Sequence, residues 1–315
     1  MANFTIKDIV KKFDLKILYQ NKKVRLSKRI VTIPGVNRGG FQLMGYESKR
    51  VSLLRRVILL SSTESEYLDT LNSDIFGSHF SNILKEYIPA IFVTQNFKYT
   101  DKLCEVATSL DSKVPVIQFF GDSSEFANTI NLYIAECLAP TTRLHGTLVN
   151  IFGCGVLITG PSGIGKSETA LDLIRNGHMF IGDDSIDILK INNKIIGRCD
   201  ELVKNFIEIR GIGILEVTKM YGYHVVMSES QIQLVIKLFG GNSTSLSNIE
   251  RIGTNLKYQQ YFNVKIPAME IPVVSGRNLA DLITSAVISL KLKEAGQDSS
   301  IKFEEEIMTT LRNEE

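Results

Sequence analysis

GVLITGPSGIGKSETALDLI, residues 155–174, joins an apolar run to a helical pattern through a glycine-rich turn. The turn and the first helical residues match the phosphate-loop pattern G-x-x-x-x-G-K-[ST] at every fixed position. The loop consists of Gly160, Pro161, Ser162, Gly163, Ile164, Gly165, Lys166 and Ser167. Glycines let the backbone curve so that its N–H groups point inward at phosphate oxygens, and the following helix adds the positive end of its dipole. The stretch therefore predicts a strand, a nucleotide-binding loop and a helix.

Lys166 and Ser167 are the loop positions whose side chains take part in phosphate chemistry. A lysine there neutralises charge between the outer phosphates, and a serine hydroxyl there binds Mg²⁺. The alternative is a glycine-rich strand-to-helix turn with an exposed lysine. Because the motif follows a predicted strand and opens a predicted helix, the phosphate loop is the favoured interpretation.

An acidic pair follows at the end of a second apolar run, HMFIGDD (178–184). Residues 179–181 are expected to form a strand that brings Asp183 and Asp184 beside the loop. Two adjacent carboxylates can divide the work, one nearer a metal ion and one free to accept a proton from an incoming nucleophile. A strand-end turn without chemistry is the alternative.

For two further residues the sequence allows either a functional or a structural role. His145, in TTRLHG, is expected to end a turn just before the strand that returns toward the loop. Glu208, in IEIRGIG, is either a second metal carboxylate or part of the polar face of a strand. His79, His178 and His224 have no polar constellation around them in the sequence and are interpreted as structural.

The chain is expected to form two domains, over residues 1–135 and 136–315. In the first, apolar runs at 57–61, 90–94 and 114–119 alternate with longer helical patterns, which is typical of βαβ units on a parallel sheet. This predicts an α/β domain, opened by an amphipathic helix with Ile6, Ile9 and Phe13 on one face. The second begins after a predicted turn at 138–143 and continues as long β-rich segments.

Two helical patterns interrupt those β-rich segments, at 167–177 and 278–296. The second starts with Asn278 and Asp281, which resemble a capping box. The last fifteen or so residues are expected to be a peripheral helix or a tail.

The composition limits which classes of partner and which cell compartment are expected. The chain has 315 residues with 36 basic and 34 acidic side chains, so its formal charge of +2 argues against nucleic acid as the main partner. No apolar run reaches the roughly 18 residues of a membrane span. The four cysteines show no C-x-x-C spacing and are interpreted as buried thiols in a reducing compartment. With no signal-peptide pattern at the N-terminus, a cytoplasmic protein is expected.

The two best-known classes of phosphate-binding enzyme are excluded by missing motifs. The guanine-reading [NT]-K-x-D segment of GTPases is absent, as are the H-R-D and D-F-G signatures of protein kinases. A small-molecule kinase and a nucleotide-gated interaction module remain as alternatives.

The run RLHGTLVNIFGCGVLITGPSGIGKSETALDLI, followed by GDD and EIRGIGI, resembles the HPr kinase/phosphorylase family. These are bifunctional regulators of the bacterial phosphotransferase sugar-uptake system. The resemblance extends over nearly the whole chain. It implies an N-terminal α/β domain followed by a phosphate-loop kinase domain related to phosphoenolpyruvate carboxykinase, assembled as a homohexamer.

The resemblance also implies roles for the matching positions. Catalytic roles fall on His145, Lys166, Asp184 and Arg251, and magnesium ligation falls on Ser167 and Glu208. Asp184 is the implied general base. Arg277 and Asn278 belong to the family's G-R-N segment.

The implied reaction moves a phosphoryl group from ATP, or from pyrophosphate, to a serine of the phosphocarrier protein HPr with Mg²⁺. In the reverse direction inorganic phosphate attacks the phosphoserine and pyrophosphate forms. One segment departs from the family, which commonly reads P-V-R-P-G-R-N. Here PVVSGRN (272–278) places Val274 and Ser275 where a basic residue and proline are usual. Since the segment is tied to dephosphorylation, we expect that direction to need more phosphate.

Overall fold

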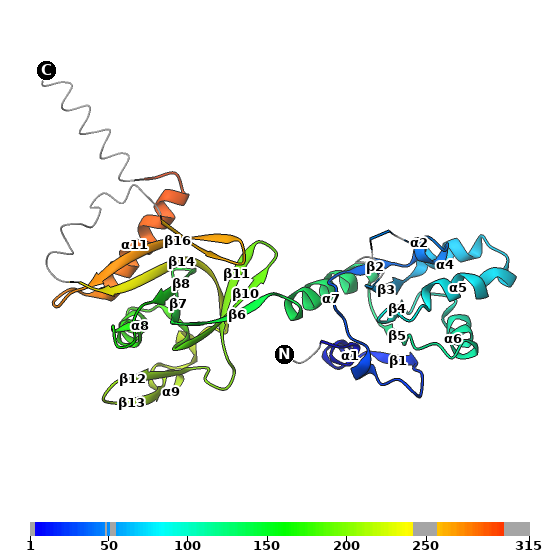
Figure 1. Cartoon of the computed structure of the whole chain (residues 1–315), viewed down its shortest axis with the longest axis horizontal. Helices are drawn as coiled ribbons and strands as arrows, with labels where there is room; N and C mark the ends of the chain where they lie inside the picture. Colours follow the sequence, from blue (N-terminus) through cyan, green and yellow to red (C-terminus); the bar gives the residue numbers. More distant parts are fainter. Residues whose placement is uncertain (1–3, 48, 51–54, 242–256, 299–315) are drawn as a thin grey trace, which may run out of the picture. The chain divides into compact units, whose positions relative to one another are not determined.

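The computed structural model describes residues 4–47, 49, 50, 55–241 and 257–298. They fall into two compact units that divide between Ala139 and Pro140. Each unit has its own sheet and its own hydrophobic core, which confirms a two-domain α/β protein (Figure 1). None of the helices in the described ranges is both long and apolar enough to cross a membrane.

The N-terminal unit is built on a five-stranded sheet in the order β1-β5-β4-β3-β2. Its strands are β1 (Lys16–Tyr19), β2 (Val36–Arg38), β3 (Val57–Leu60), β4 (Ile91–Thr94) and β5 (Val116–Phe119). β2 to β5 run parallel, and β1 pairs antiparallel with β5. The three strands predicted from apolar runs are therefore confirmed, together with their parallel direction. β1 and β2 were not predicted because they are short and only partly buried.

Helices cover both faces of this sheet. They are α1 (Ile6–Phe13), α2 (Gly40–Leu43), α4 (Ser62–Asp69), α5 (Phe76–Ile83), α6 (Thr100–Ser109) and α7 (Ser123–Cys137). α1 and α7 pack on one face, whereas α5 and α6 pack on the other. The expected opening helix is confirmed as α1. The helical pattern between β3 and β4 is divided into α4 and α5, where the Asn72 side chain caps a short 3-10 turn.

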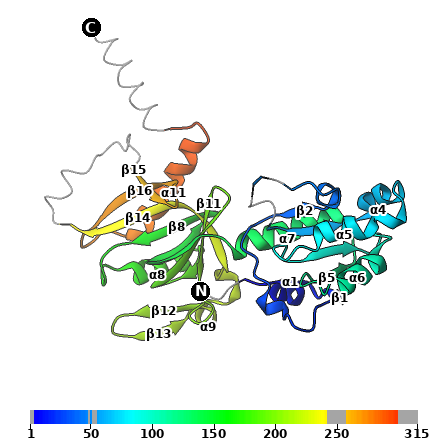
Figure 2. The ribbon, with the colours of Figure 1, turned by 45° about the vertical axis from the view of Figure 1, so that its right-hand side comes forward.

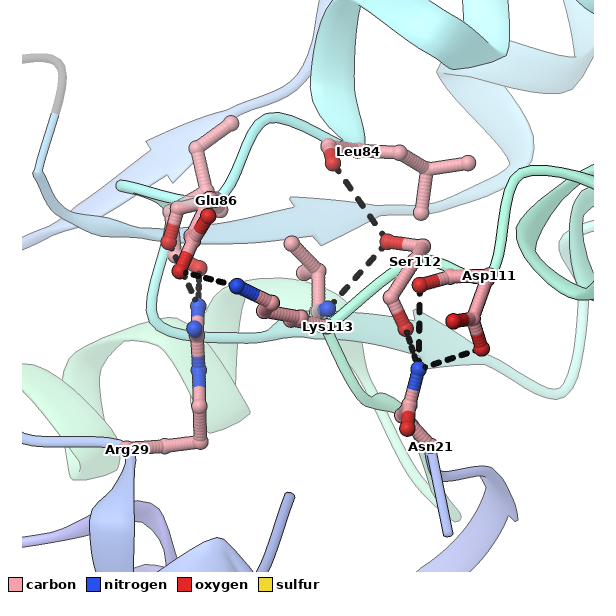
Figure 3. Close-up of polar contacts among 9 residues, drawn as sticks. Asn21, Arg29, Leu84, Glu86, Asp111, Ser112 and Lys113 are labelled. Carbon is pink, nitrogen blue, oxygen red and sulfur yellow. Dashed lines mark hydrogen bonds and ion pairs between the residues drawn. The ribbon is translucent and has the colours of Figure 1, made fainter. Parts of the chain in front are cut away.

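Polar contacts fasten the segment before β2 to the amino ends of β4 and β5 (Figure 3). Asn21 is 6% exposed, and its side-chain amide donates to the carbonyl oxygens of Asp111 and Ser112 at 2.9 and 3.2 Å. Arg29 donates to the Glu86 carbonyl at 3.0 Å. Burial lowers the pKa of the Arg29 guanidinium, whereas the Glu86 carboxylate raises it. The segment is held as part of the domain because these contacts satisfy otherwise unpaired loop carbonyls.

The C-terminal unit contains a large branched sheet with the path β6-β10-β11-β14-β8-β7-β9, on which β16 pairs with β14 and β15. The strands are β6 (Thr141–His145), β7 (Thr147–Ile151), β8 (Cys154–Thr159), β9 (Met179–Gly182), β10 (Ser185–Ile191), β11 (Lys194–Cys199), β14 (Glu229–Gly240), β15 (Lys257–Tyr261) and β16 (Val264–Val273). β12 (Phe206–Ile209) and β13 (Gly213–Glu216) form a separate hairpin, which both views place apart from the large sheet (Figures 1 and 2).

The two predicted helices of this unit are confirmed as α8 (Lys166–Arg175) and α11 (Leu279–Glu294), and a short α9 (Val217–Tyr221) follows the hairpin. α8 and α11 pack together against β8 and β14 through one apolar cluster. A second cluster joins side chains of β7 and β8 with those of β10 and β11. Packing against α11 and the sheet holds α8 in place. The phosphate-loop motif lies at the start of α8.

Two sequence-based expectations were wrong. Residues 141–143, predicted as part of a turn, belong to strand β6, and His145 is the last residue of that strand rather than the end of a turn. The physical reason is tertiary, since β6 is held by antiparallel pairing with β10, some forty residues later. The cysteines were expected to be buried, but Cys137 is exposed and Cys104 only partly buried; Cys154 and Cys199 are buried, and all four are free thiols.

Strand directions bring the predicted site residues to one edge of the sheet. β7 runs antiparallel to both of its neighbours, β8 and β9. The carboxyl ends of β8 and β9 and the amino end of β7 therefore share an edge. β14 and β16 run parallel to β8, so their carboxyl ends lie there too. In α/β sheets this edge is where ligands bind.

Candidate active site

The segment with the phosphate-loop motif connects β8 to α8, so that it stands between a strand and a helix, as the motif predicts. Gly160, Gly163 and Gly165 all have positive φ angles, of 150°, 76° and 101°. A Cβ at Gly160 would also lie 2.5 Å from the carbonyl oxygen of Leu238 on β14. The loop therefore needs glycine for its backbone conformation and, at position 160, for close packing against the neighbouring strand.

Lys166 is held inside this loop. Its side chain belongs to a residue that is only 7% exposed, and its ammonium group donates to the carbonyl oxygens of Gly160 and Pro161 at 3.1 and 3.0 Å. A buried ammonium group needs partners of this kind. The positive charge of Lys166 is thus held against the loop's own backbone.

A pocket of about 160 Å³ opens beside the loop. It is lined by His145, Ser162, Gly163, Gly165, Lys166, Ser167, Glu168, Asp183, Asp184, Glu208 and Arg210. These residues come from the phosphate loop, the first turn of α8, the ends of β6 and β9, and the β12–β13 hairpin. Most of the residues that the sequence singled out therefore meet in one place.

The two aspartates after β9 face different partners. Asp183 is 7% exposed, and its Oδ2 accepts a hydrogen bond of 2.7 Å from the Ser167 hydroxyl. The Asp184 side chain is 73% exposed and lies beside His145. Asp184 has a φ of 65°, so the chain turns sharply between the two carboxylates. The pair is divided into a buried carboxylate at the loop serine and an open one in the pocket.

His145 is oriented by Asp184. Its Nδ1 lies 2.9 Å from both the backbone oxygen and Oδ1 of Asp184. Because both of these atoms are acceptors, Nδ1 carries a proton in this arrangement. Pairing of His145 with Ser185 across β6 and β10 sets the distance between the two side chains. The imidazole and the open carboxylate form one polar unit at the mouth of the pocket.

Glu208 and Arg210 reach the pocket from the hairpin. Along β12, Ile207 and Ile209 are buried, so Glu208 faces away from the core. Arg210 donates to the Ser162 hydroxyl of the phosphate loop over 2.9 Å. Sequence reasoning did not single out Arg210, although it stands two residues after Glu208 in the same E-I-R-G segment. Its contact with the loop spans 48 positions, and no local pattern shows it.

The remaining predicted positions lie elsewhere. Arg251 falls outside the described residues. Asn278 caps α11, since its side-chain oxygen accepts from the backbone N–H groups of Ala280 and Asp281 at 3.0 and 3.4 Å. Val274 is half-buried in the turn after β16, and Arg277 is exposed there. This turn shares the sheet edge of the phosphate loop without contributing to the described pocket lining.

The acidic and hydroxyl groups fit Mg²⁺ held together with a nucleotide. Within the described ranges no three His, Cys, Asp or Glu side chains gather closely enough to enclose a metal ion by themselves. Mg²⁺ in nucleotide enzymes usually takes one or two carboxylates, substrate phosphates and water. Ser167, Asp183 and Glu208 on the pocket walls supply that kind of donor set.

Comparison with known proteins places the chain in a family. Residues 4–134 match the model of the HPr Serine kinase N terminus, and residues 136–307 match that of the HPr Serine kinase C-terminal domain. The chain belongs to the HPr serine kinase family. The two matched HPr serine kinase regions follow one another along nearly the whole sequence.

Relatives in this HPr serine kinase family match over almost their full length. The HPr kinase/phosphorylase of Mycoplasma genitalium is 36% identical over 303 residues, covering 96% of each chain. That of Streptococcus salivarius is 36% identical over 308 residues, covering 98% of this chain and 97% of its own. A solved HPr(Ser) kinase/phosphatase from Coxiella burnetii is 34% identical, covers 51% of this chain and 98% of its own, and has a TM-score of 0.46.

Proposed function

We propose that this chain is an HPr kinase/phosphorylase, which transfers a phosphoryl group from ATP to a serine hydroxyl of HPr and removes it again. Family membership supports this function, because near-full-length relatives have that name. The structural observation that supports it most directly is the position of Asp184. Its open carboxylate stands in the same pocket as the phosphate-loop residues Lys166 and Ser167.

In the kinase direction the loop holds the phosphates of ATP. Lys166 moves its ammonium group from the loop carbonyls to the outer phosphate oxygens. The serine hydroxyl of HPr attacks the γ-phosphorus, the bond from that phosphorus to the bridging oxygen of ADP breaks, and Asp184 accepts the hydroxyl proton. His145 and the Asp184 carboxylate orient each other through the His145 Nδ1–H. A serine hydroxyl is a poor nucleophile near neutral pH, so transfer needs such a base.

In the phosphorylase direction the same groups act in reverse. Inorganic phosphate in the loop attacks the phosphorus of phosphoserine, and the bond from phosphorus to the serine oxygen breaks. Asp184 returns a proton to that oxygen, and pyrophosphate leaves. The same path read backward makes pyrophosphate a phosphoryl donor. One pocket therefore suffices for both activities, because Asp184 accepts the proton in one direction and returns it in the other.

Ser167 and Glu208 are the proposed Mg²⁺ ligands, with Asp183 next to Ser167. Bound Mg²⁺ neutralises charge on the phosphate oxygens during transfer. Within the chain, Ser167 directs its only proton to Asp183, which leaves its oxygen lone pairs free for a cation.

The wider setting of the reaction is part of the same proposal. We infer a cytoplasmic homohexamer with a catalytic domain related to phosphoenolpyruvate carboxykinase, supported by family membership alone. Light scattering of the purified protein tests the assembly and should give six times the mass of one chain.

A transfer assay tests the function. The protein is incubated with HPr, Mg²⁺ and ATP labelled at the γ-phosphate, and the label is expected on an HPr serine. Adding inorganic phosphate to the labelled product should release labelled pyrophosphate. Label that appears only on an added metabolite would favour a small-molecule kinase, and nucleotide binding without turnover would favour an ATP-gated interaction module.

A further inference from the structure

Thr147 contacts the buried aspartate of the site from the opposite side to Ser167. Its hydroxyl donates to Asp183 Oδ1 over 2.5 Å, whereas the Ser167 hydroxyl donates to Oδ2 over 2.7 Å. Thr147 itself is 0% exposed. Each oxygen of one carboxylate is thus held by one hydroxyl, so that the carboxylate cannot rotate without breaking a hydrogen bond.

The position of Thr147 follows from the sheet. It is the first residue of β7, the strand that lies between the loop strand β8 and the aspartate strand β9. Because β7 is antiparallel to both, its first residue lies at the edge where the other two strands end. Thr147 therefore stands between the phosphate loop and Asp183. Neither the loop motif nor the acidic pair in the sequence indicates this position.

The charge of the buried Asp183 carboxylate indicates what the hydrogen bond from Thr147 prepares. The carboxylate is almost fully buried, its hydrogen-bond partners are two neutral hydroxyls, and no basic side chain of the described residues forms an ion pair with it. A buried carboxylate without a cation is costly. A cation bound at Ser167 beside it would compensate that charge.

We propose that Thr147 is a positioning residue for the metal site: it fixes the Asp183 carboxylate, and through it the Ser167 hydroxyl, in the orientation that receives a divalent cation with the nucleotide. This inference rests on the proposed function of the site as a metal–nucleotide site. Thr147 acts only through Asp183. Among the described residues, the hydrogen bond of its hydroxyl goes to Asp183 and not to the loop or to Asp184.

Two substitutions separate the hydroxyl from the packing. Thr147→Val keeps the branched shape and removes the hydrogen bond, whereas Thr147→Ser keeps the hydroxyl and removes one methyl group. Thr169→Val is the matched control, because Thr169 is also buried beside the loop but donates to the carbonyl of Gly165, the N-cap residue of its own helix, and not to Asp183. Thermal unfolding of all three variants confirms that each is folded.

The measurements use Mn²⁺ as a spectroscopic probe for the divalent ion. Free Mn²⁺ is followed by electron paramagnetic resonance while full-length protein with ATP is titrated, and ATP binding is measured separately in EDTA. Thr147→Val is expected to weaken Mn²⁺ binding about tenfold, the effect of losing one hydrogen bond to a charged group. ATP affinity in EDTA should stay unchanged, and Thr147→Ser and Thr169→Val should resemble the wild type.

Three results would contradict a positioning role for Thr147. Equal weakening of metal-dependent and metal-free ATP binding in Thr147→Val, or wild-type Mn²⁺ binding in that variant, would show that Thr147 is only a packing residue. Failure of Thr147→Ser to restore Mn²⁺ binding would do the same. Because none of these measurements uses HPr, they are independent of whether wild-type protein labels HPr, which tests the proposed function by itself.

Discussion

Ser167 and Asp183 are joined by a 2.7 Å hydrogen bond, although they stand on different elements of the C-terminal unit. Ser167 lies in the first turn of α8, and Asp183 follows β9. This hydrogen bond engages the buried carboxylate of Asp183, whereas the carboxylate of Asp184 stays open to the pocket. Two neighbouring aspartates therefore have separate expected roles, and exchange of either one should give a different defect.

Asp184→Asn is expected to bind ATP almost normally and to lose both directions of transfer. The amide has the same size but cannot accept or return a proton, and general acid–base catalysis is worth roughly 10² to 10⁴ in rate. Single-turnover transfer to HPr and phosphate-dependent formation of pyrophosphate from phosphorylated HPr measure the two directions. Asp183→Asn is the matched comparison and should also weaken Mg²⁺-dependent ATP binding. If Asp184→Asn lost only ATP affinity while turnover survived, Asp183 would become the better candidate for the base.

Lys166→Ala is expected to abolish phosphoryl transfer. The substitution removes the charge that offsets the outer phosphate oxygens in a preorganised site, where such interactions are worth several kcal/mol, or roughly 10² to 10³ in rate. Labelled transfer to HPr measures the loss, and circular dichroism checks the fold. Near wild-type kinase activity in this variant would contradict the phosphate-loop assignment. Ser167→Ala, in contrast, should mainly raise the Mg²⁺ concentration that is required.

His178 is expected to make the stability of the C-terminal unit depend on pH. It is 5% exposed, and burial lowers the pKa of its imidazole below the ordinary 6.5. Below pH 6.5 the unfolded chain therefore binds a proton that the folded chain resists. The stabilisation by neutral His178 is complete above pH 6.5 and is lost as the pH falls toward the lowered pKa.

The effect is measured as the unfolding free energy at pH 7.5 and pH 5.5. The wild-type protein should lose more free energy over this interval than His178→Gln, whose amide does not titrate. His178 contacts Phe152 edge-to-face and lies 3.5 Å from the Thr284 hydroxyl, so the variant is expected to be less stable at pH 7.5. An equal loss in both proteins would show that other groups cause the pH dependence.

Val274→Arg is expected to assist dephosphorylation. β16 ends at the same sheet edge as the phosphate loop, and Val274 follows it directly. If a basic side chain there holds phosphate or phosphoserine, one restored charge-assisted contact should lower the phosphate concentration for half-maximal dephosphorylation about tenfold. The KM for ATP in the kinase direction should hardly change. An equal effect on both directions, or none on either, would mean that position 274 is a structural part of the turn.

Local patterns determined the elements whose signals are contained in a short window. The phosphate loop was predictable because the backbone conformation of residues 160–165 itself demands glycine, and the motif stands between a strand and a helix. The strands β3, β4 and β5 were predictable because each is a short, mostly apolar run whose apolar side chains are buried, although Gln118 in β5 is polar and only partly buried. The cap of α11 at Asn278 was visible for the same reason, since it involves only the next three residues.

Tertiary structure alone decided which side chains meet. Residues 141–143 became a strand because β10 pairs with them, against their turn-like composition. Arg210 reaches Ser162, and Thr147 reaches Asp183, across separations of 48 and 36 positions. The division between Asp183 and Asp184 depends on a positive φ angle and on partners from two other strands. The sequence by itself thus determined the phosphate loop and the apolar strands, because local backbone geometry and burial specify them. The partners of each carboxylate were decided only by tertiary structure, because hydrogen bonds between distant strands leave no periodic signal in the chain: β7 between β8 and β9 brings Thr147 to Asp183, and the pairing of β6 with β10 brings His145 to Asp184.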